Sequence, residues 1–294
     1  MSALPETTGT IYDIGYRRYD GPRLGRRGAI SAIVGAGLRA VFGLGRSGRS
    51  KVLPWGAVIL AMLPAVVAIA IRVLAGDIIE LYSYHNYLWE IGLLLPIFLA
   101  AQAPELVVND MRQRVLPLYF SRPIGRFDYV VAKLGALIVG LLALTLLPVL
   151  LLFLGRVLAA EDVVGALGDE LGFLPTIIGT GLVYAAVLAS IGLAICSLAG
   201  RRAYAAAAIL ALFLVGSVMS TTLRELGNGL ENLAPFTYPL SILDGTREWL
   251  FGEGVLNSPV ADASVPLPLY ALAAAALLGV SWAVLLLRYR SVAT

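Results

Sequence analysis

The sequence predicts an all-α integral membrane protein with six transmembrane helices. Of its 294 residues, 59% are hydrophobic and only 14% are charged, and the mean hydropathy is +0.84. Soluble domains carry about 25% charged residues. Because much of any folded surface must face water, a soluble fold of this length cannot hide so much apolar material. A bilayer is therefore the solvent that this composition fits.

Six apolar runs are long enough to cross a bilayer core as helices, which takes roughly 20 residues. They cover residues 52–74, 88–108, 129–154, 173–198, 203–222 and 267–287. Only four residues separate the fourth run from the fifth, so these two helices should form a tight hairpin. We therefore expect a cytoplasmic N-terminal segment, residues 1–51, and a six-span transmembrane domain, residues 52–294.

The positive charges predict that both termini are cytoplasmic. The polar, arginine-rich start of the chain lacks the short apolar core of a signal peptide, so the N-terminus should stay inside. In that orientation 18 of the 22 Lys and Arg residues are cytoplasmic, and the four outer ones are Arg72, Arg156, Arg224 and Arg247. Lys and Arg concentrate on the cytoplasmic side of membrane proteins, and this bias sets the orientation.

Small residues mark one face of two spans. Ala185, Ala189 and Gly192 share a face of the fourth span, and the fifth span carries Ala203, Ala207 and Ala211 at helical spacing. Small side chains let helix backbones approach closely inside a membrane. Both faces are therefore expected to pack against other helices.

An amphipathic pattern covers residues 29–44. Apolar side chains recur there at helical spacing, with arginines elsewhere on the wheel. The stretch is too short to cross a bilayer, so we expect an N-terminal helix that lies in the cytoplasmic interface. An ordinary cytoplasmic helix is the alternative.

The segment between the fifth and sixth spans, residues 223–266, is expected to be a long outer loop. It holds short apolar runs, and Pro235 and Pro239 interrupt it. These runs are too short to span, so they should dip into the outer leaflet or cap the exit of a pathway. Loops of this length tend to be functional.

Several patterns that suggest chemistry lack the context for it. Residues 43–50 read GLGRSGRS, which fits a dinucleotide-binding pattern, but no βαβ unit surrounds them and Arg49 stands where a P-loop needs lysine. His85 is the only histidine and Cys196 the only cysteine, so neither a metal cluster nor a catalytic triad is expected. We therefore predict no catalytic residue, metal ligand or cofactor on this chain. The net charge of +3 suggests no nucleic acid partner.

The richest polar segment on the cytoplasmic side joins the second and third spans. Residues 104–133 read PELVVNDMRQRVLPLYFSRPIGRFDYVVAK. This segment resembles the cytoplasmic loop of type-2 ABC transporter permeases, the membrane subunits of many bacterial exporters. The matching residues are Glu105, Asp110, Arg112, Pro117, Ser121, Arg122, Pro123, Arg126, Tyr129 and Lys133. The run IYDIGYRRYDGPRLGR, residues 11–26, also resembles a lead-in seen in that family.

The resemblance implies a transport subunit of the bacterial cytoplasmic membrane that is not itself an enzyme. Such permeases pair with a second copy or a homologous chain, and lipid surrounds the pair. Each permease docks on a separate ABC ATPase through a short coupling helix between the second and third spans. The ATPase holds the ATP and Mg. The residues expected to couple to the ATPase are Glu105, Asp110, Arg112, Arg114, Pro117, Ser121, Arg122, Pro123 and Arg126.

The physical properties of this loop suit that role. A rigid short helix can transmit a rigid-body displacement, and arginines form forked hydrogen bonds to carboxylates of a partner. In related permeases the second and fifth spans line the pathway. Here they are almost entirely apolar except for Gln102, Ser217, Ser220 and Thr221, so we expect a hydrophobic or amphiphilic cargo.

Two other functions remain open. A membrane-embedded lipid-modifying enzyme would need a polar cluster near one interface, and only Glu105, Asp110 and their neighbours supply one. A structural or assembly protein is the third possibility. An ion-coupled carrier is not expected, because ionisable residues deep in the spans are almost absent and relays are built from them.

Overall fold

The computed structural model describes residue 21 and residues 25–76, 82–113, 115–121, 123–255 and 258–291. Of these residues, 82% are helical and none forms a strand. The helices are α1 (Gly25–Val41), α2 (Arg49–Ala75), α3 (Tyr84–Glu90), α4 (Leu94–Arg112), α5 (Leu116–Phe120), α6 (Arg126–Thr145), α7 (Leu147–Leu158), α8 (Val163–Glu170), α9 (Leu174–Leu198), α10 (Arg202–Leu226), α11 (Pro239–Phe251) and α12 (Leu267–Ser291), with short 3-10 turns η2 (Leu171–Phe173), η3 (Leu230–Asn232) and η4 (Ala234–Thr237).

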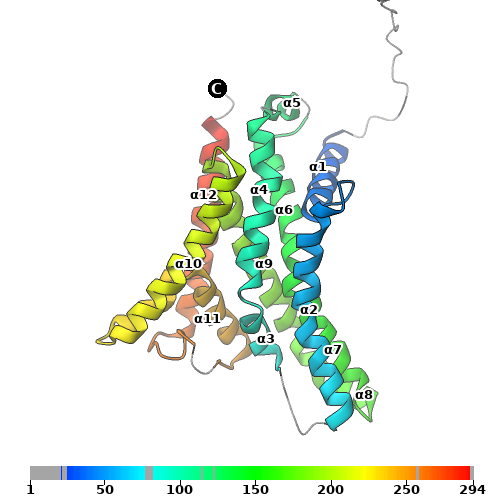
Figure 1. The fold of residues 1–294 in the computed structure, drawn as a ribbon, viewed down its shortest axis with the longest axis vertical. Helices are drawn as coiled ribbons and strands as arrows, with labels where there is room; N and C mark the ends of the chain where they lie inside the picture. Colours follow the sequence, from blue (N-terminus) through cyan, green and yellow to red (C-terminus); the bar gives the residue numbers. More distant parts are fainter. Residues whose placement is uncertain are drawn as a thin grey trace, which may run out of the picture.

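The long helices form a bundle with two distinct ends. Figure 1 shows α1, α5 and the last turns of α12 at one end, which we call the α5 end, and α3, α8 and α11 at the other, which we call the α8 end. The hairpin between α9 and α10 also lies at the α5 end, and α10 leans away from α4 toward the α8 end. Connections that the sequence assigns to one side of a membrane thus lie together.

Five helical stretches in the described part of the chain are long and apolar enough to cross a membrane. They are α2, α6 with α7, α8 with α9, α10 and α12. A sixth crossing results if α3 and α4 count together, because these two helices are bent by 62° relative to each other. The multi-pass, all-helical prediction is therefore confirmed at this level.

The second predicted span, residues 88–108, is not one continuous helix. It breaks in a turn around Gly92, between α3 and α4. A β-carbon at Gly92 would lie 3.0 Å from the carbonyl oxygen of Trp89, so the turn favours glycine there. The run of apolar residues indicated the span but carried no periodicity that would indicate the break.

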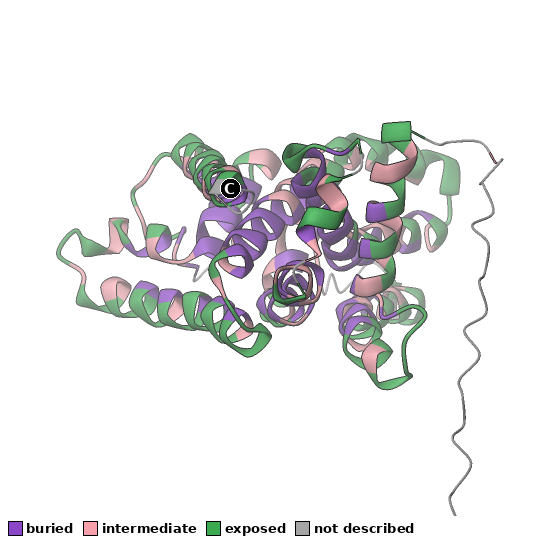
Figure 2. Cartoon of the chain, turned by 90° about the horizontal axis from the view of Figure 1, so that it is seen from above, coloured by how far each residue is buried: buried purple, intermediate pink, exposed green. Residues whose placement is uncertain are grey.

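Helix α9 is the centre of the bundle, where it packs against α4, α6 and α12. Buried residues gather in the middle of the end-on view, and exposed ones face outward (Figure 2). Ala185 and Ala189 are fully buried, and a β-carbon at Gly192 would lie 2.6 Å from the Leu99 side chain. The predicted small-residue face of the fourth span therefore does pack closely, here against α4.

The small-residue face of α10 behaves differently. The buried stripe of α10 consists of Ala205, Ile209, Phe213, Gly216 and Ser220. Its predicted packing face, Ala203, Ala207 and Ala211, is exposed. Within the described residues α10 turns another stripe inward, so packing of these alanines against a further helix stays a prediction.

The predicted N-terminal amphipathic helix is present as α1, and it is fastened to α6. Its buried residues are Ile33, Gly37 and Val41. A β-carbon on Gly37 would lie 2.6 Å from Ala136, and one on Gly140 would lie 2.5 Å from Val41. The two helices therefore run in the same direction at close range. The expectation that this helix lies flat in the interface is wrong, because its buried stripe packs along α6, which is part of a candidate span.

The predicted outer loop contains a helix that enters the bundle. Helix α11 begins at Pro239, is capped by Gly252 in the left-handed region, and packs against α9 and α12. Every residue from 239 to 248 is buried. A β-carbon on Gly245 would lie 2.3 Å from the Tyr270 ring, so this close packing requires glycine. The sequence predicted neither this helix nor its packing inside the bundle, where it also buries charged residues.

Candidate functional site

The short helix expected between the second and third spans is α5, which lies at the tip of the bundle. It is five residues long and follows Val115, with Pro117 in its first turn. The Ser121 hydroxyl donates to the Leu118 carbonyl at 2.9 Å where the helix ends. Proline suits a first helical turn because its missing N–H has no partner there. A short helix therefore does lie in this segment, at Leu116–Phe120.

An aromatic cluster fastens α5 to the bundle. The ring of Tyr129, on α6, is fully buried. Its centroid lies 5.7 Å from that of Tyr119 and 6.3 Å from that of Phe120, both on α5, and 5.4 Å from that of Tyr289 on α12. Aromatic pairs in such tilted arrangements contribute about 0.5–1.5 kcal/mol each beyond burial. Movement of α5 is therefore tied to movement of α6 and α12.

A charged network lies directly beneath this cluster. One carboxylate oxygen of Asp110 accepts a hydrogen bond from the Tyr129 hydroxyl at 2.8 Å and lies 2.7 Å from the Lys133 ammonium. The Asp110 and Lys133 side chains are mostly buried. Asp110 was expected to face the ATPase, but the structure turns it inward, where it joins the end of α4 to α6.

Glu105 is also bound within the chain. Its carboxylate accepts from Arg46 at 2.7 Å and pairs with Arg202. Arg46 lies between α1 and α2, and Arg202 begins α10. Glu105 therefore joins three elements at the level where the apolar spans start, and it too differs from the expected partner contact.

The start of α6 is held by two further contacts. Arg26 on α1 donates two hydrogen bonds to Asp128, at 2.9 and 2.7 Å, and the N–H of Gly125 donates to the same carboxylate at 2.9 Å. The hydrogen bonds and negative charge of Asp128 raise the pKa of the Arg26 guanidinium. Arg126 donates to the carbonyl of Arg290 at 3.2 Å, near the end of α12.

The outward surface of this region, which we call the α5 tip, combines apolar and basic side chains. Its exposed residues are Arg112, Gln113, Pro117, Leu118, Ser121, Pro123 and Arg126. Leu118 is 68% exposed. Two expected coupling residues, Arg114 and Arg122, lie outside the described residues. Leu118, which the sequence did not single out, is the most prominent apolar side chain that α5 exposes.

The four expected pathway residues do not form one site. Gln102 lines a cavity of ≈ 170 Å³ toward the α5 end, together with Arg46, Arg49 and Glu105. Ser217 lines a different cavity of ≈ 210 Å³ beside the α3–α4 break. Helix α10 nevertheless packs along α4.

The other two expected pathway residues, Ser220 and Thr221, line neither of these cavities. The exposed Thr221 donates to the Ser217 carbonyl at 3.0 Å. Ser220 is buried, and its hydroxyl has no hydrogen-bond partner among the described residues.

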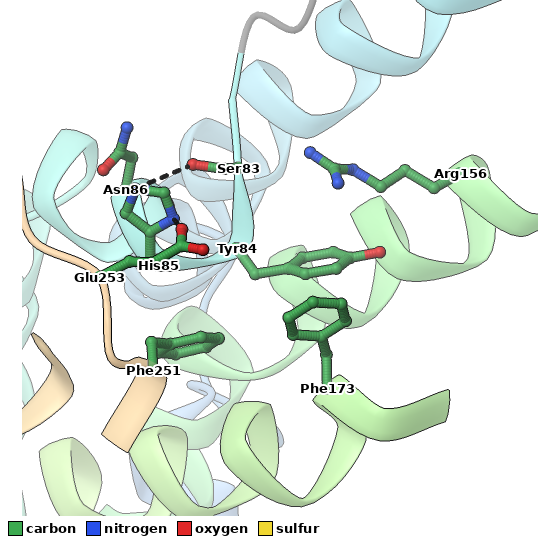
Figure 3. Close-up of a pocket in the computed structure, with 8 residues that line it drawn as sticks. All are labelled: Ser83, Tyr84, His85, Asn86, Arg156, Phe173, Phe251 and Glu253. Atoms are coloured by element: carbon green, nitrogen blue, oxygen red, sulfur yellow. Dashed lines mark hydrogen bonds and ion pairs between the residues drawn. The ribbon is translucent and has the colours of Figure 1, made fainter. Parts of the chain in front are cut away.

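A polar pocket of ≈ 330 Å³ opens at the α8 end. Nδ1 of His85 lies 2.9 Å from the Glu253 carboxylate, and its Nε2 lies 3.4 Å from the Ser83 hydroxyl. Across the pocket, the Arg156 guanidinium lies 4.5 Å from the centre of the Tyr84 ring (Figure 3). Nothing in the sequence indicated this arrangement around His85, because Glu253 comes from a distant part of the chain.

A buried charge cluster on α11 was also missed from the sequence. Arg247 is fully buried between Asp244 and Glu248, with its guanidinium nitrogen 3.7 and 3.6 Å from their carboxylate oxygens. The Tyr184 hydroxyl donates to Asp244 at 2.6 Å. The sequence signal for this cluster was the helical spacing of Asp244, Arg247 and Glu248 among mostly apolar residues.

The sequence matches no known protein-family profile, and no curated protein matches it at a significant level.

Proposed function

We propose that the chain is the transmembrane permease subunit of an ATP-binding cassette exporter of type 2, driven by a separate ATPase subunit. The observation that carries this proposal is the α5 tip. A short helix with an exposed outer face is fastened on its inner face to α6 and α12 by the aromatic cluster around Tyr129. Such an element can receive a push from a partner and pass it to the spans as a rigid-body motion.

The orientation of the proposal follows from charge. The cytoplasmic side is the α5 end, since the segments rich in Lys and Arg gather there. The α8 end then faces outward. Six crossings follow when the bent pair α3 and α4 is counted as one span.

Pairing of two permeases is supported by the exposed face of α10. Ala203, Ala207 and Ala211 lie along one side of this helix and are exposed among the described residues. Small residues at spacing of four are typical of helix–helix interfaces in membranes. A second copy or a homologous chain is therefore the proposed occupant of this face.

Purification tests the proposal directly. An affinity-tagged chain, expressed in its native host and extracted in mild detergent, should carry with it a protein with Walker motifs, identified by mass spectrometry. The purified pair should hydrolyse ATP, and the chain alone should not. Purification without any nucleotide-binding protein, from cells that export normally, would reject the proposal.

A lipid-modifying enzyme is the second candidate, and one observation favours it. Ser83, His85 and Glu253 follow the order of nucleophile, base and carboxylate. The arrangement is weak support because Glu253 is 66% exposed and the serine–histidine separation is long. A fluorophosphonate probe that labels the wild type but not Ser83→Ala would establish this enzyme, and absence of labelling would remove it.

A further inference from the structure

A cavity of ≈ 210 Å³ lies where the α3–α4 break, α9, α10 and the start of α11 meet. Trp89, Tyr184, Ser217, Tyr238 and Asp244 supply its polar and aromatic lining, and leucines complete it. The α3–α4 break and α10 border it, and they belong to the second and fifth spans, which are expected to line the pathway. The cavity is therefore placed where a transported molecule would pass toward the α8 end.

Asp244 carries the only charge among the described residues that line this cavity. Its side chain is almost entirely buried. Arg247 does not neutralise the region, because one guanidinium lies between two carboxylates, those of Asp244 and Glu248. Its three guanidinium nitrogens make no hydrogen bond to the described residues. With all three groups ionised, the cluster carries a net charge of −1, and Asp244 is its member that lines the cavity.

The aromatic lining complements that charge. Three aromatic residues line the cavity, Trp89, Tyr184 and Tyr238. Aromatic rings attract cations through the negative potential of their faces. Pockets that enclose a whole drug-sized ligand have volumes of about 300–1,000 Å³, and this cavity is smaller. The cavity thus suits the charged head of a larger molecule whose apolar part extends beyond it.

We propose that this cavity binds the ammonium group of amphipathic organic cations and that such amines are the substrate class of the exporter. This inference rests on the proposed function, but the binding site can be tested without it. An anion would be repelled by the excess negative charge of the cluster, and a neutral apolar molecule would gain nothing from it. A cation gains from both the carboxylate and the rings.

Calorimetry on the purified chain in dodecyl maltoside tests the site, with empty micelles as the blank. The probe is benzyltrimethylammonium, and neopentylbenzene is the control because it has the same shape without the charge. The cation should bind saturably and the neutral compound should not. Asp244→Asn should weaken cation binding at least tenfold, whereas Asp262→Asn, at an exposed acid near Arg224, should leave it unchanged.

A second variant keeps the test decisive if Asp244→Asn fails to fold. Ser217→Leu fills the cavity from α10 and leaves the charge cluster intact, so it should also weaken binding at least tenfold. No saturable binding, equal binding of the two probes, or undiminished binding by either folded variant would overturn the inference. A chain that binds cations through Asp244 but recruits no ATPase would contradict the exporter role and leave the site standing.

Discussion

The hydroxyl of Tyr129 donates to the carboxylate of Asp110 across 2.8 Å, and this bond connects the α5 tip to the charged layer beneath it. Tyr129 contacts both aromatic residues of α5 through its ring and the end of α4 through its oxygen. A single buried side chain therefore joins the expected docking helix to two spans.

Removal of the Asp110 charge should destabilise the protein more than removal of the tyrosine hydroxyl. Asp110→Asn leaves the mostly buried Lys133 ammonium without its carboxylate and should cost about 2–3 kcal/mol, since both groups retain some contact with water. Tyr129→Phe should cost about 1 kcal/mol. Thermal unfolding in detergent measures both. Asp110→Asn as stable as the wild type would show that the network is not structural.

The contact between α1 and α6 should depend on one arginine of an adjacent pair. Arg26→Ala removes both hydrogen bonds to Asp128, so backbone amides of residues 25–41 should exchange hydrogen faster. Arg27→Ala is the matched control, because Arg27 is its exposed neighbour and should leave exchange unchanged. The same effect from both variants would mean that bulk charge, not the Asp128 contact, holds α1.

Loss of the Glu105 carboxylate should lower the thermal midpoint. The guanidinium groups of Arg46 and Arg202 both lie against the Glu105 carboxylate. Glu105→Gln removes the negative charge that these two positive groups share. The arginines are partly exposed, so the expected cost is only about 1 kcal/mol. Glu161→Gln, at an exposed acid of the α8 end, should have no effect. Equal midpoints for both variants would contradict the role assigned to Glu105.

The exposed alanine face of α10 should lie at the interface between two copies. In a chain whose only cysteine is removed by Cys196→Ala, a cysteine introduced by Ala207→Cys should form a disulfide-linked dimer under mild oxidation. Ala276→Cys, at an exposed position of α12, should stay monomeric. Crosslinking from Ala276 and not from Ala207 would place the interface on the other side of the bundle.

Helix content and the main crossings follow from the sequence because apolar runs of this length have few alternatives in a membrane. A short helix between the second and third spans was also expected, and Pro117 lies in the first turn of α5. The break at Gly92 does not, since apolar residues flank it on both sides and only the packing of its neighbours sets the turn.

Long-range polar contacts could not be predicted in the same way. Arg26 and Asp128 are 102 positions apart. His85 and Glu253 are separated in the chain by the long helices α4, α6, α9 and α10. Local patterns identify charges but not their partners. Hence Glu105 and Asp110 read as docking residues in the sequence and turn out to be bound inside the chain.

Assembly with the ATPase through the α5 tip is the central claim, and a pair of leucine variants tests it most directly. Leu118 is 68% exposed on the α5 tip, and Leu158 is 70% exposed at the far end of α7. Each is changed to glutamate, and the amount of ATPase that copurifies is measured with the ATP hydrolysis of the complex. Leu118→Glu should lower both at least tenfold, which corresponds to about 1.4 kcal/mol of binding free energy, while Leu158→Glu retains both. Full assembly and activity of Leu118→Glu would contradict the account.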